Sequence, residues 1–157
     1  MPIADRRRVA LLVLAAALAL TACGDDDGGG ADGLTAEPFH LGLEAGQCFD
    51  RPTDPDVTSV PAVPCRQPHD LEVIAVFTLD EGEYPGRPEV ARAAGEGCQE
   101  RFADYVGTTL DSSGLLLVPY TPDRLAWEQG DREVTCAVSR ADGQLDGSVE
   151  GSESPPA

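Results

Sequence analysis

The sequence contains no lysine, and its 11 basic residues are all arginine, set against 28 aspartates and glutamates. The formal net charge of −17 leaves little basic surface for phosphate contacts, which argues against a nucleic-acid-binding protein. The same charge gives the folded part no electrostatic attraction to anionic lipid. Several enzyme signatures are missing too, since there is no Gly-x-Ser-x-Gly, no HExxH and no Walker loop. We therefore expect no catalytic residues, no cofactor and no nucleic-acid partner.

The N-terminal residues have the pattern of a secretory signal peptide. Three arginines, Arg6 to Arg8, precede twelve apolar residues from Val9 to Leu20. As a helix this run is only about 18 Å long, too short for a bilayer core of about 30 Å. The segment Leu20-Thr21-Ala22-Cys23-Gly24 resembles the bacterial lipobox, which implies removal of residues 1–22 and attachment of diacylglycerol to Cys23. The alternative is ordinary cleavage that leaves a spare thiol.

This interpretation predicts a lipid anchor through Cys23 that holds the protein on the extracytoplasmic face of the cell membrane. The export route stays open between the general and the twin-arginine pathways. Residues 23–37 are rich in glycine and aspartate and predict a flexible acidic tether after the lipidated cysteine. Residues 142–157 are similarly poor in large apolar side chains and predict a disordered tail. The remaining residues, 38–141, are enough for one domain.

Within that domain, hydrophobic periodicity predicts strands on both sides of one main helix. From Leu71 to Leu79, every second residue is apolar and lies on one face of a strand, and further apolar residues lie on the other face. This pattern is typical of a strand near the centre of a sheet. Pro88 to Val106 predicts the helix, ended by Gly107 and weakened by Gly95 and Gly97. Residues 47–50 and 58–63 predict two short strands, and residues 115–120 and 133–139 predict two longer ones. A short helix is predicted from Thr121-Pro122 to Gln129. The fold class is α+β, a small domain with a mostly antiparallel sheet and one main helix packed on it.

Four cysteines remain after lipidation: Cys48, Cys65, Cys98 and Cys136. An exported chain meets an oxidising environment, where such a set ordinarily forms two disulfides. Periodicity places Cys98 and Cys136 on inward faces and favours their pairing, whereas Cys48–Cys65 rests only on nearness in sequence. A zinc site that uses Cys65-x-x-x-His69 with Cys48 is the alternative. Because the paired CxxC spacing of structural zinc is absent, we predict no metal site.

A candidate binding patch comprises His69, Asp70, Trp127, Asp131 and Arg132. His69 and Asp70 could form a surface imidazole–carboxylate pair, but ordering of the turn before the central strand explains them better. Trp127 could anchor a partner, although a single tryptophan in a domain of this size most often packs in the core.

The spacing of several motifs resembles the septum-formation-related domain of actinobacterial secreted lipoproteins and membrane proteins. The most specific motifs are Pro64-Cys65-x-x-Pro68-His69 and Trp127-x-x-Gly130-Asp131-Arg132-x-x-x-Cys136, within a resemblance that covers about residues 44–140. Other matching positions are Gly46, Cys48, Glu72, Tyr84-Pro85-Gly86, Cys98, Phe102, Tyr105, Gly107, Tyr120 and Pro122. The resemblance implies a link to cell-division septa and transfers no catalytic residue.

The functional hypothesis is a non-enzymatic interaction module that binds an unknown envelope or division protein. One alternative is a hydrolase-like envelope enzyme that uses His69 and Asp70. Another is a sensory or substrate-binding lipoprotein domain.

Overall fold

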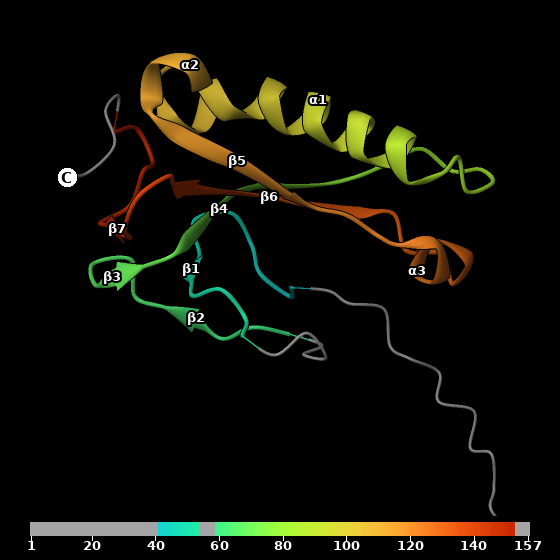
Figure 1. Cartoon of the computed structure of the whole chain (residues 1–157), viewed down its shortest axis with the longest axis horizontal. Helices are drawn as coiled ribbons and strands as arrows, with labels where there is room; N and C mark the ends of the chain where they lie inside the picture. Colours follow the sequence, from blue (N-terminus) through green and yellow to red (C-terminus); the bar gives the residue numbers. More distant parts are fainter. Residues whose placement is uncertain (1–40, 54–58, 153–157) are drawn as a thin grey trace, which may run out of the picture. The chain divides into compact units, whose positions relative to one another are not determined.

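The computed structural model describes residues 41–53 and 59–152 of the chain (Figure 1). The predicted signal peptide (1–22), Cys23 and the predicted tether (23–37) lie outside the described residues. The described chain forms strands β1 (Cys48–Phe49), β2 (Ala62–Val63), β3 (Pro68–His69) and β4 (Leu71–Thr78), then helices α1 (Arg87–Val106) and α2 (Leu110–Ser113), strand β5 (Leu115–Tyr120), helix α3 (Arg124–Glu128) and strands β6 (Glu133–Arg140) and β7 (Leu145–Asp146).

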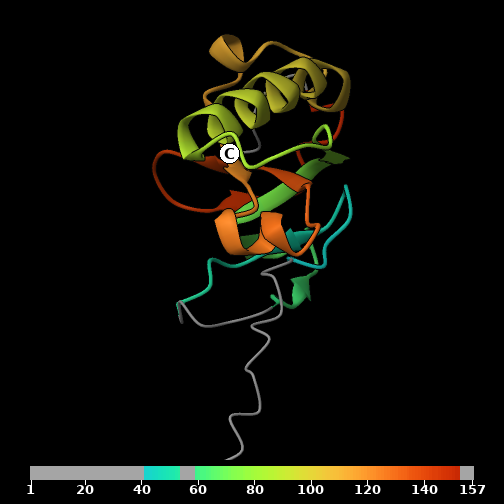
Figure 2. The ribbon, with the colours of Figure 1, turned by 90° about the vertical axis from the view of Figure 1, so that its right-hand side faces the viewer.

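The main sheet has the strand order β2-β1-β4-β6-β5, with each neighbouring pair antiparallel. Strands β3 and β7 form a second, two-stranded sheet. Helix α1 lies along one face of the main sheet (Figures 1 and 2). The α+β prediction is therefore confirmed, including the central position of β4 and the edge position of β2, whose preceding Pro61 has no N–H to donate.

The predicted alternation along β4 is wrong in one respect, because the strand contains a register shift between Val73 and Ala75. Before the shift, Leu71 and Val73 pack with Phe49 on the sheet face away from α1. Ile74, which lies at the shift, and Phe77, which follows it, pack on the helix side. A bulge adds one residue to a strand and so moves the side-chain alternation to the other face. Consequently β4 contributes to two cores.

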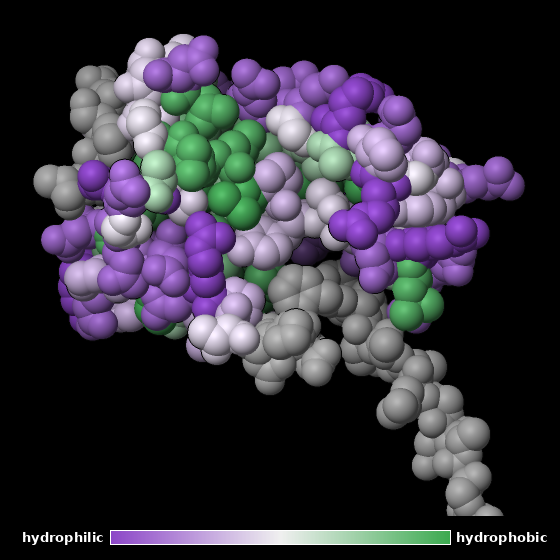
Figure 3. Space-filling model, in the orientation of Figure 1, coloured by the Kyte–Doolittle hydropathy of each residue, from purple (hydrophilic) through white to green (hydrophobic). Residues whose placement is uncertain are grey.

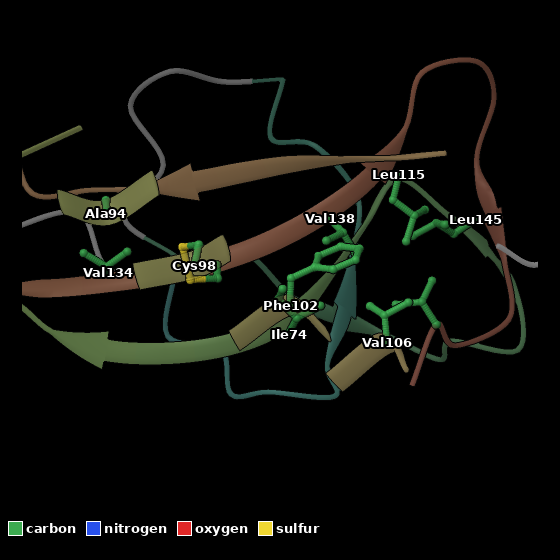
Figure 4. Packing of buried hydrophobic residues seen from close by; sticks show 11 residues of the cluster. Ile74, Ala94, Cys98, Phe102, Val106, Leu115, Val134, Val138 and Leu145 are labelled. Carbon is green, nitrogen blue, oxygen red and sulfur yellow. A yellow bond between two sulfur atoms is a disulfide. The ribbon is translucent and has the colours of Figure 1, made fainter. Parts of the chain in front are cut away.

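The core between α1 and the sheet depends on a stripe of helix residues four positions apart: Val90, Ala94, Cys98, Phe102 and Val106 are all buried. Figure 4 shows Ala94, Cys98, Phe102 and Val106 of this stripe against side chains of β4, β5, β6 and the C-terminal segment. Ala91, directly after Val90, is exposed. Gly107 ends the helix in the left-handed conformation (φ 88°), as predicted. No helix among the described residues is long and apolar enough to cross a membrane.

The prediction of a disordered tail over 142–157 is wrong for residues 142–152. Strand β7 begins at Leu145, and both Leu145 and Val149 are fully buried in the α1 core. The Gly151 N–H donates to the carbonyl of Tyr105 (2.9 Å), which fastens the segment to the end of α1. Two well-placed apolar residues are enough to bury a segment of otherwise polar composition, and composition alone does not reveal this.

Both predicted disulfides are present. Cys98–Cys136 joins α1 to β6 with a Cα–Cα distance of 5.5 Å, and Cys48–Cys65 joins β1 to the turn before β3 with a distance of 5.3 Å. The first lies in the α1 core, where Figure 4 shows its yellow bond.

Apolar side chains gather over α2 and β5 on the face shown in Figure 3, where Leu116 of β5 is 49% exposed. In the main sheet β5 is an edge strand. Pro119 within it removes one N–H from the strand, which limits pairing with another chain.

Candidate functional site

The two parts of the predicted binding patch lie at opposite ends of β4. His69 and Asp70 precede the strand, whereas the carbonyl of Arg132 accepts a hydrogen bond from the N–H of Leu79, just after it (2.9 Å). A strand of this length spans about 25 Å. The structure therefore brings Trp127, Asp131 and Arg132 together beside α3 and separates them from His69 and Asp70 (Figure 1).

Arg132 and Trp127 form the centre of the α3 end. The Arg132 guanidinium lies 3.9 Å from the centroid of the Trp127 ring and donates through Nη1 to the backbone carbonyls of Trp127 (2.6 Å) and Asp131 (2.7 Å). Both side chains are buried, with exposed fractions of 8% and 5%. The family motif Trp-x-x-Gly-Asp-Arg thus forms a local unit in which the arginine stacks on the tryptophan and bonds the turn that separates them.

The loop between β4 and α1 closes over this unit. The carbonyl of Gly82 accepts from Trp127 Nε1 (2.9 Å) and from Arg132 Nη2 (3.3 Å). Tyr84 packs edge-on against Trp127, with ring centroids 5.8 Å apart. Glu81 lies 3.8 Å from Arg132 Nη2. Trp127 and Arg132, which the sequence placed in one binding patch, therefore hold the loop between β4 and α1 in position.

Helix α3 begins two residues later than predicted. Its N-cap is Asp123, whose carboxylate accepts a hydrogen bond from the N–H of Ala126 (2.8 Å), so the predicted first turn at Thr121-Pro122 is wrong. The later start places Leu125 on the exposed side, where it is 51% accessible, and Trp127 on the buried side.

A cavity of about 300 Å³ lies beside this corner, between the loop and the first turns of α1. It is lined by Leu79, Asp80, Glu81, Glu83, Pro85, Glu89, Val90, Arg92, Ala93 and Trp127, and we call it the acidic cavity. Two further hollows of about 470 and 540 Å³ adjoin it around Tyr84, Arg124 and Glu128.

Charge in the acidic cavity is unbalanced. Its wall carries four carboxylates and one guanidinium. That guanidinium, Arg92, is engaged by Glu89 at 3.1 Å and by Glu96 at 2.8 Å, and these hydrogen bonds raise its pKa further. Asp80 and Glu83 have no ion-pair partner within the described ranges. The cavity therefore has a negative potential and suits a cationic group.

At the opposite end, His69 is fully buried in β3. Its Nδ1 lies 2.7 Å from the carbonyl of Gln67, and its Nε2 has no hydrogen-bond partner among the described residues. Asp70 accepts instead from the backbone N–H of Arg51 (3.0 Å) and from Gln144 Nε2 (3.0 Å). The two side chains order the turn before β4 and share no hydrogen bond in these contacts.

Sequence reasoning missed a buried carboxylate near His69. Glu72 of β4 is fully buried, and its Oε1 accepts from the hydroxyls of Tyr105 (2.7 Å) and Ser148 (2.6 Å). Its Oε2 accepts from the N–H of Val149 (2.8 Å). Burial, together with the Glu72 acceptor, raises the pKa of Tyr105 well above its ordinary value. The available signal was a single acidic residue inside an otherwise apolar central strand.

One group of side chains in the described part of the chain has atoms suited to hold a metal. A ring nitrogen of His69, Sγ of Cys48 and a carboxylate oxygen of Glu72 lie within 4.8 Å of one another, and all three residues are buried. Cys48 is in a disulfide, so its sulfur is not a thiolate in this structure.

These features define a disulfide-stapled α+β domain with an acidic concave surface at one end of its sheet. A family model described as septum formation matches residues 40–145, so the chain belongs to the septum-formation family. No curated protein and no solved structure matches the chain significantly.

Proposed function

We propose that this protein is a lipid-anchored, extracytoplasmic and non-enzymatic module that binds a basic segment of an envelope protein during septum formation. The observation that carries the binding role is the acidic cavity, whose wall has four carboxylates and also includes Trp127. A lysine or arginine side chain placed there would meet unpaired carboxylates and an aromatic surface. The exposed Leu125 on the neighbouring helix adds an apolar contact.

Family membership supports a role in septum formation. The anchor is supported by the apolar run and by the lipobox-like residues that end at Cys23. Binding without catalysis is favoured because the alternative enzyme would need His69 as a base. That ring is buried, and its Nδ1 is held by a backbone carbonyl.

The anchor is tested with Cys23→Ala, which removes the thiol that would carry the diacylglycerol. We expect the protein to move from the membrane fraction to the soluble fraction, since loss of the acyl chains removes the anchor. A matched Cys98→Ala/Cys136→Ala variant should stay with the membrane. Membrane retention of Cys23→Ala would refute the anchor.

The binding role is tested by complementation of a deletion strain. Asp80→Asn/Glu81→Gln/Glu83→Gln removes three charges from the acidic cavity and should fail to restore normal septa. The control Asp104→Asn/Asp111→Asn/Asp142→Asn removes three exposed charges elsewhere and should restore them. Equal rescue by both variants would refute the acidic cavity as the binding surface. Normal septa in the deletion strain would refute the septal role.

A further inference from the structure

We propose that the Cys48–Cys65 disulfide covers a latent zinc site, which forms when a thiol reductant opens it. The ligands would be the thiolates of Cys48 and Cys65, Nε2 of His69 and the carboxylate of Glu72. This site is distinct from the acidic cavity, which lies at the other end of β4.

The imidazole of His69 is oriented as a metal-binding histidine usually is. Its Nδ1 faces the carbonyl of Gln67 at 2.7 Å, so Nδ1 carries the proton in the neutral ring and Nε2 keeps its lone pair. His69 is fully buried, and its Nε2 has no hydrogen-bond partner among the described residues. Buried polar atoms without a partner are uncommon and require an explanation.

Glu72 is held in the same way as a ligating carboxylate. Hydroxyl groups of Tyr105 and Ser148 fix its Oε1, and among the described residues Oε2 accepts only the N–H of Val149. A second lone pair of Oε2 is therefore left for a cation. Such outer contacts orient ligands and support metal affinity.

Three of the four ligand atoms require only a small closure. One ring nitrogen of His69, Cys48 Sγ and one Glu72 oxygen lie within 4.8 Å of one another. Tetrahedral zinc bonds to sulfur, nitrogen and oxygen give ligand separations of about 3.4 to 3.8 Å. Cys65 Sγ is bonded to Cys48 Sγ and supplies the fourth ligand once the bond is open.

Opening the disulfide is a two-electron reduction by a dithiol. A thiolate of the reductant attacks Sγ of Cys65, which is partly exposed, and Cys48 leaves as a thiolate. The second thiolate of the reductant then releases Cys65 and closes the reductant's own disulfide. Zn²⁺ binds both thiolates, and two protons pass to solvent.

The test uses the full chain with Cys23→Ala, reduced with a phosphine and titrated with Co²⁺ as a spectroscopic substitute for Zn²⁺. We expect one equivalent to bind with thiolate charge-transfer absorption and tetrahedral visible bands, and Zn²⁺ to displace it. Affinity for the reduced protein should exceed that for the oxidised protein by at least about 100-fold. A further Cys98→Ser/Cys136→Ser change should leave this signal unchanged.

His69→Asn should weaken Co²⁺ binding at least about 10-fold, and Cys48→Ser/Cys65→Ser should abolish the charge-transfer band. Circular dichroism in the presence of Zn²⁺ follows the fold of each variant. No Co²⁺ signal from the reduced chain, or an undiminished signal from His69→Asn, would overturn the proposal. Loss of the fold on reduction despite added Zn²⁺ would overturn it as well.

Discussion

Single residues at the α3 corner show how a motif becomes local structure. The Arg132 guanidinium makes three kinds of contact. It stacks on Trp127, donates a hydrogen bond to the Trp127 carbonyl at the end of α3, and donates another to the carbonyl of Gly82 in the loop between β4 and α1. The planar guanidinium can make these contacts together, whereas an ammonium group cannot. The sequence suggested Arg132 for a binding patch but did not show that its hydrogen bonds are with backbone carbonyl groups.

Arg132→Lys should lower the free energy of unfolding by about 1 to 3 kcal/mol, because buried carbonyls lose their donor. Urea unfolding followed by tryptophan fluorescence measures this effect directly. The control Arg124→Lys changes an exposed residue paired with Glu128 and should alter stability by less than about 0.5 kcal/mol. Equal effects of the two substitutions would show that the Arg132 contacts are unimportant for stability.

Tyr120 supplies a prediction about pH. Burial raises its pKa above the ordinary 10.0, and the nearby Arg51 charge opposes this only in part. Since the folded-state pKa exceeds the unfolded one, Tyr120 contributes stability that is complete below pH 10.0 and is lost as the pH rises through the folded-state pKa.

Between about pH 9 and about pH 11, the free energy of unfolding should therefore fall more for the wild-type protein than for Tyr120→Phe. Urea unfolding at both pH values provides the measurement. An equal fall in the two proteins would contradict a raised pKa at this position.

At the scale of elements, the pairing of α1 with β4 depends on the absence of a side chain. A Cβ on Gly97 would meet the ring of Phe77, at 2.9 Å from Cε2 and closer still to Cζ. Arg101 lies over that ring at 4.2 Å and donates to the carbonyl of Gly97 (2.7 Å). Gly97 is predicted to weaken the helix, but together with Arg101 it packs against the aromatic ring of the neighbouring strand.

Gly97→Ala should therefore destabilise the protein by about 1 to 3 kcal/mol despite the better helix propensity of alanine. Gly95 has nothing within 4 Å of the corresponding position, so Gly95→Ala should stabilise by about 0.5 to 1 kcal/mol. Thermal unfolding should show a lower melting temperature for Gly97→Ala and a higher one for Gly95→Ala than for the wild-type protein. Stabilisation by both would mean that Phe77 moves aside without cost.

Over the whole molecule, two disulfides and a packed C-terminal segment compensate for a small and strongly acidic chain. Cys98–Cys136 closes a loop with a sequence separation of 38 and Cys48–Cys65 one of 17. Loop entropy assigns them about 4 and about 3 kcal/mol respectively, as upper values. The larger contribution thus comes from the bond inside the main core.

Cys98→Ala/Cys136→Ala should accordingly lower the unfolding free energy more than Cys48→Ala/Cys65→Ala. The difference in loop length alone gives about 0.7 kcal/mol, and the cavity in the core adds to it. Denaturant unfolding of both double variants under non-reducing conditions checks the order. A larger loss from the Cys48 pair would contradict this account.

The sequence by itself determined the α+β class, the position and ends of α1, the central strand and both disulfides. The elements follow from periodicity and from glycine at a helix end. Cys98–Cys136 follows from cysteines on inward faces, whereas Cys48–Cys65 was inferred only from nearness in sequence. Only the tertiary structure decided that the predicted patch divides between the two ends of β4, that residues 142–152 are packed and that Glu72 lies beside His69. Each depends on contacts between residues far apart in the chain, and no local pattern contains that information.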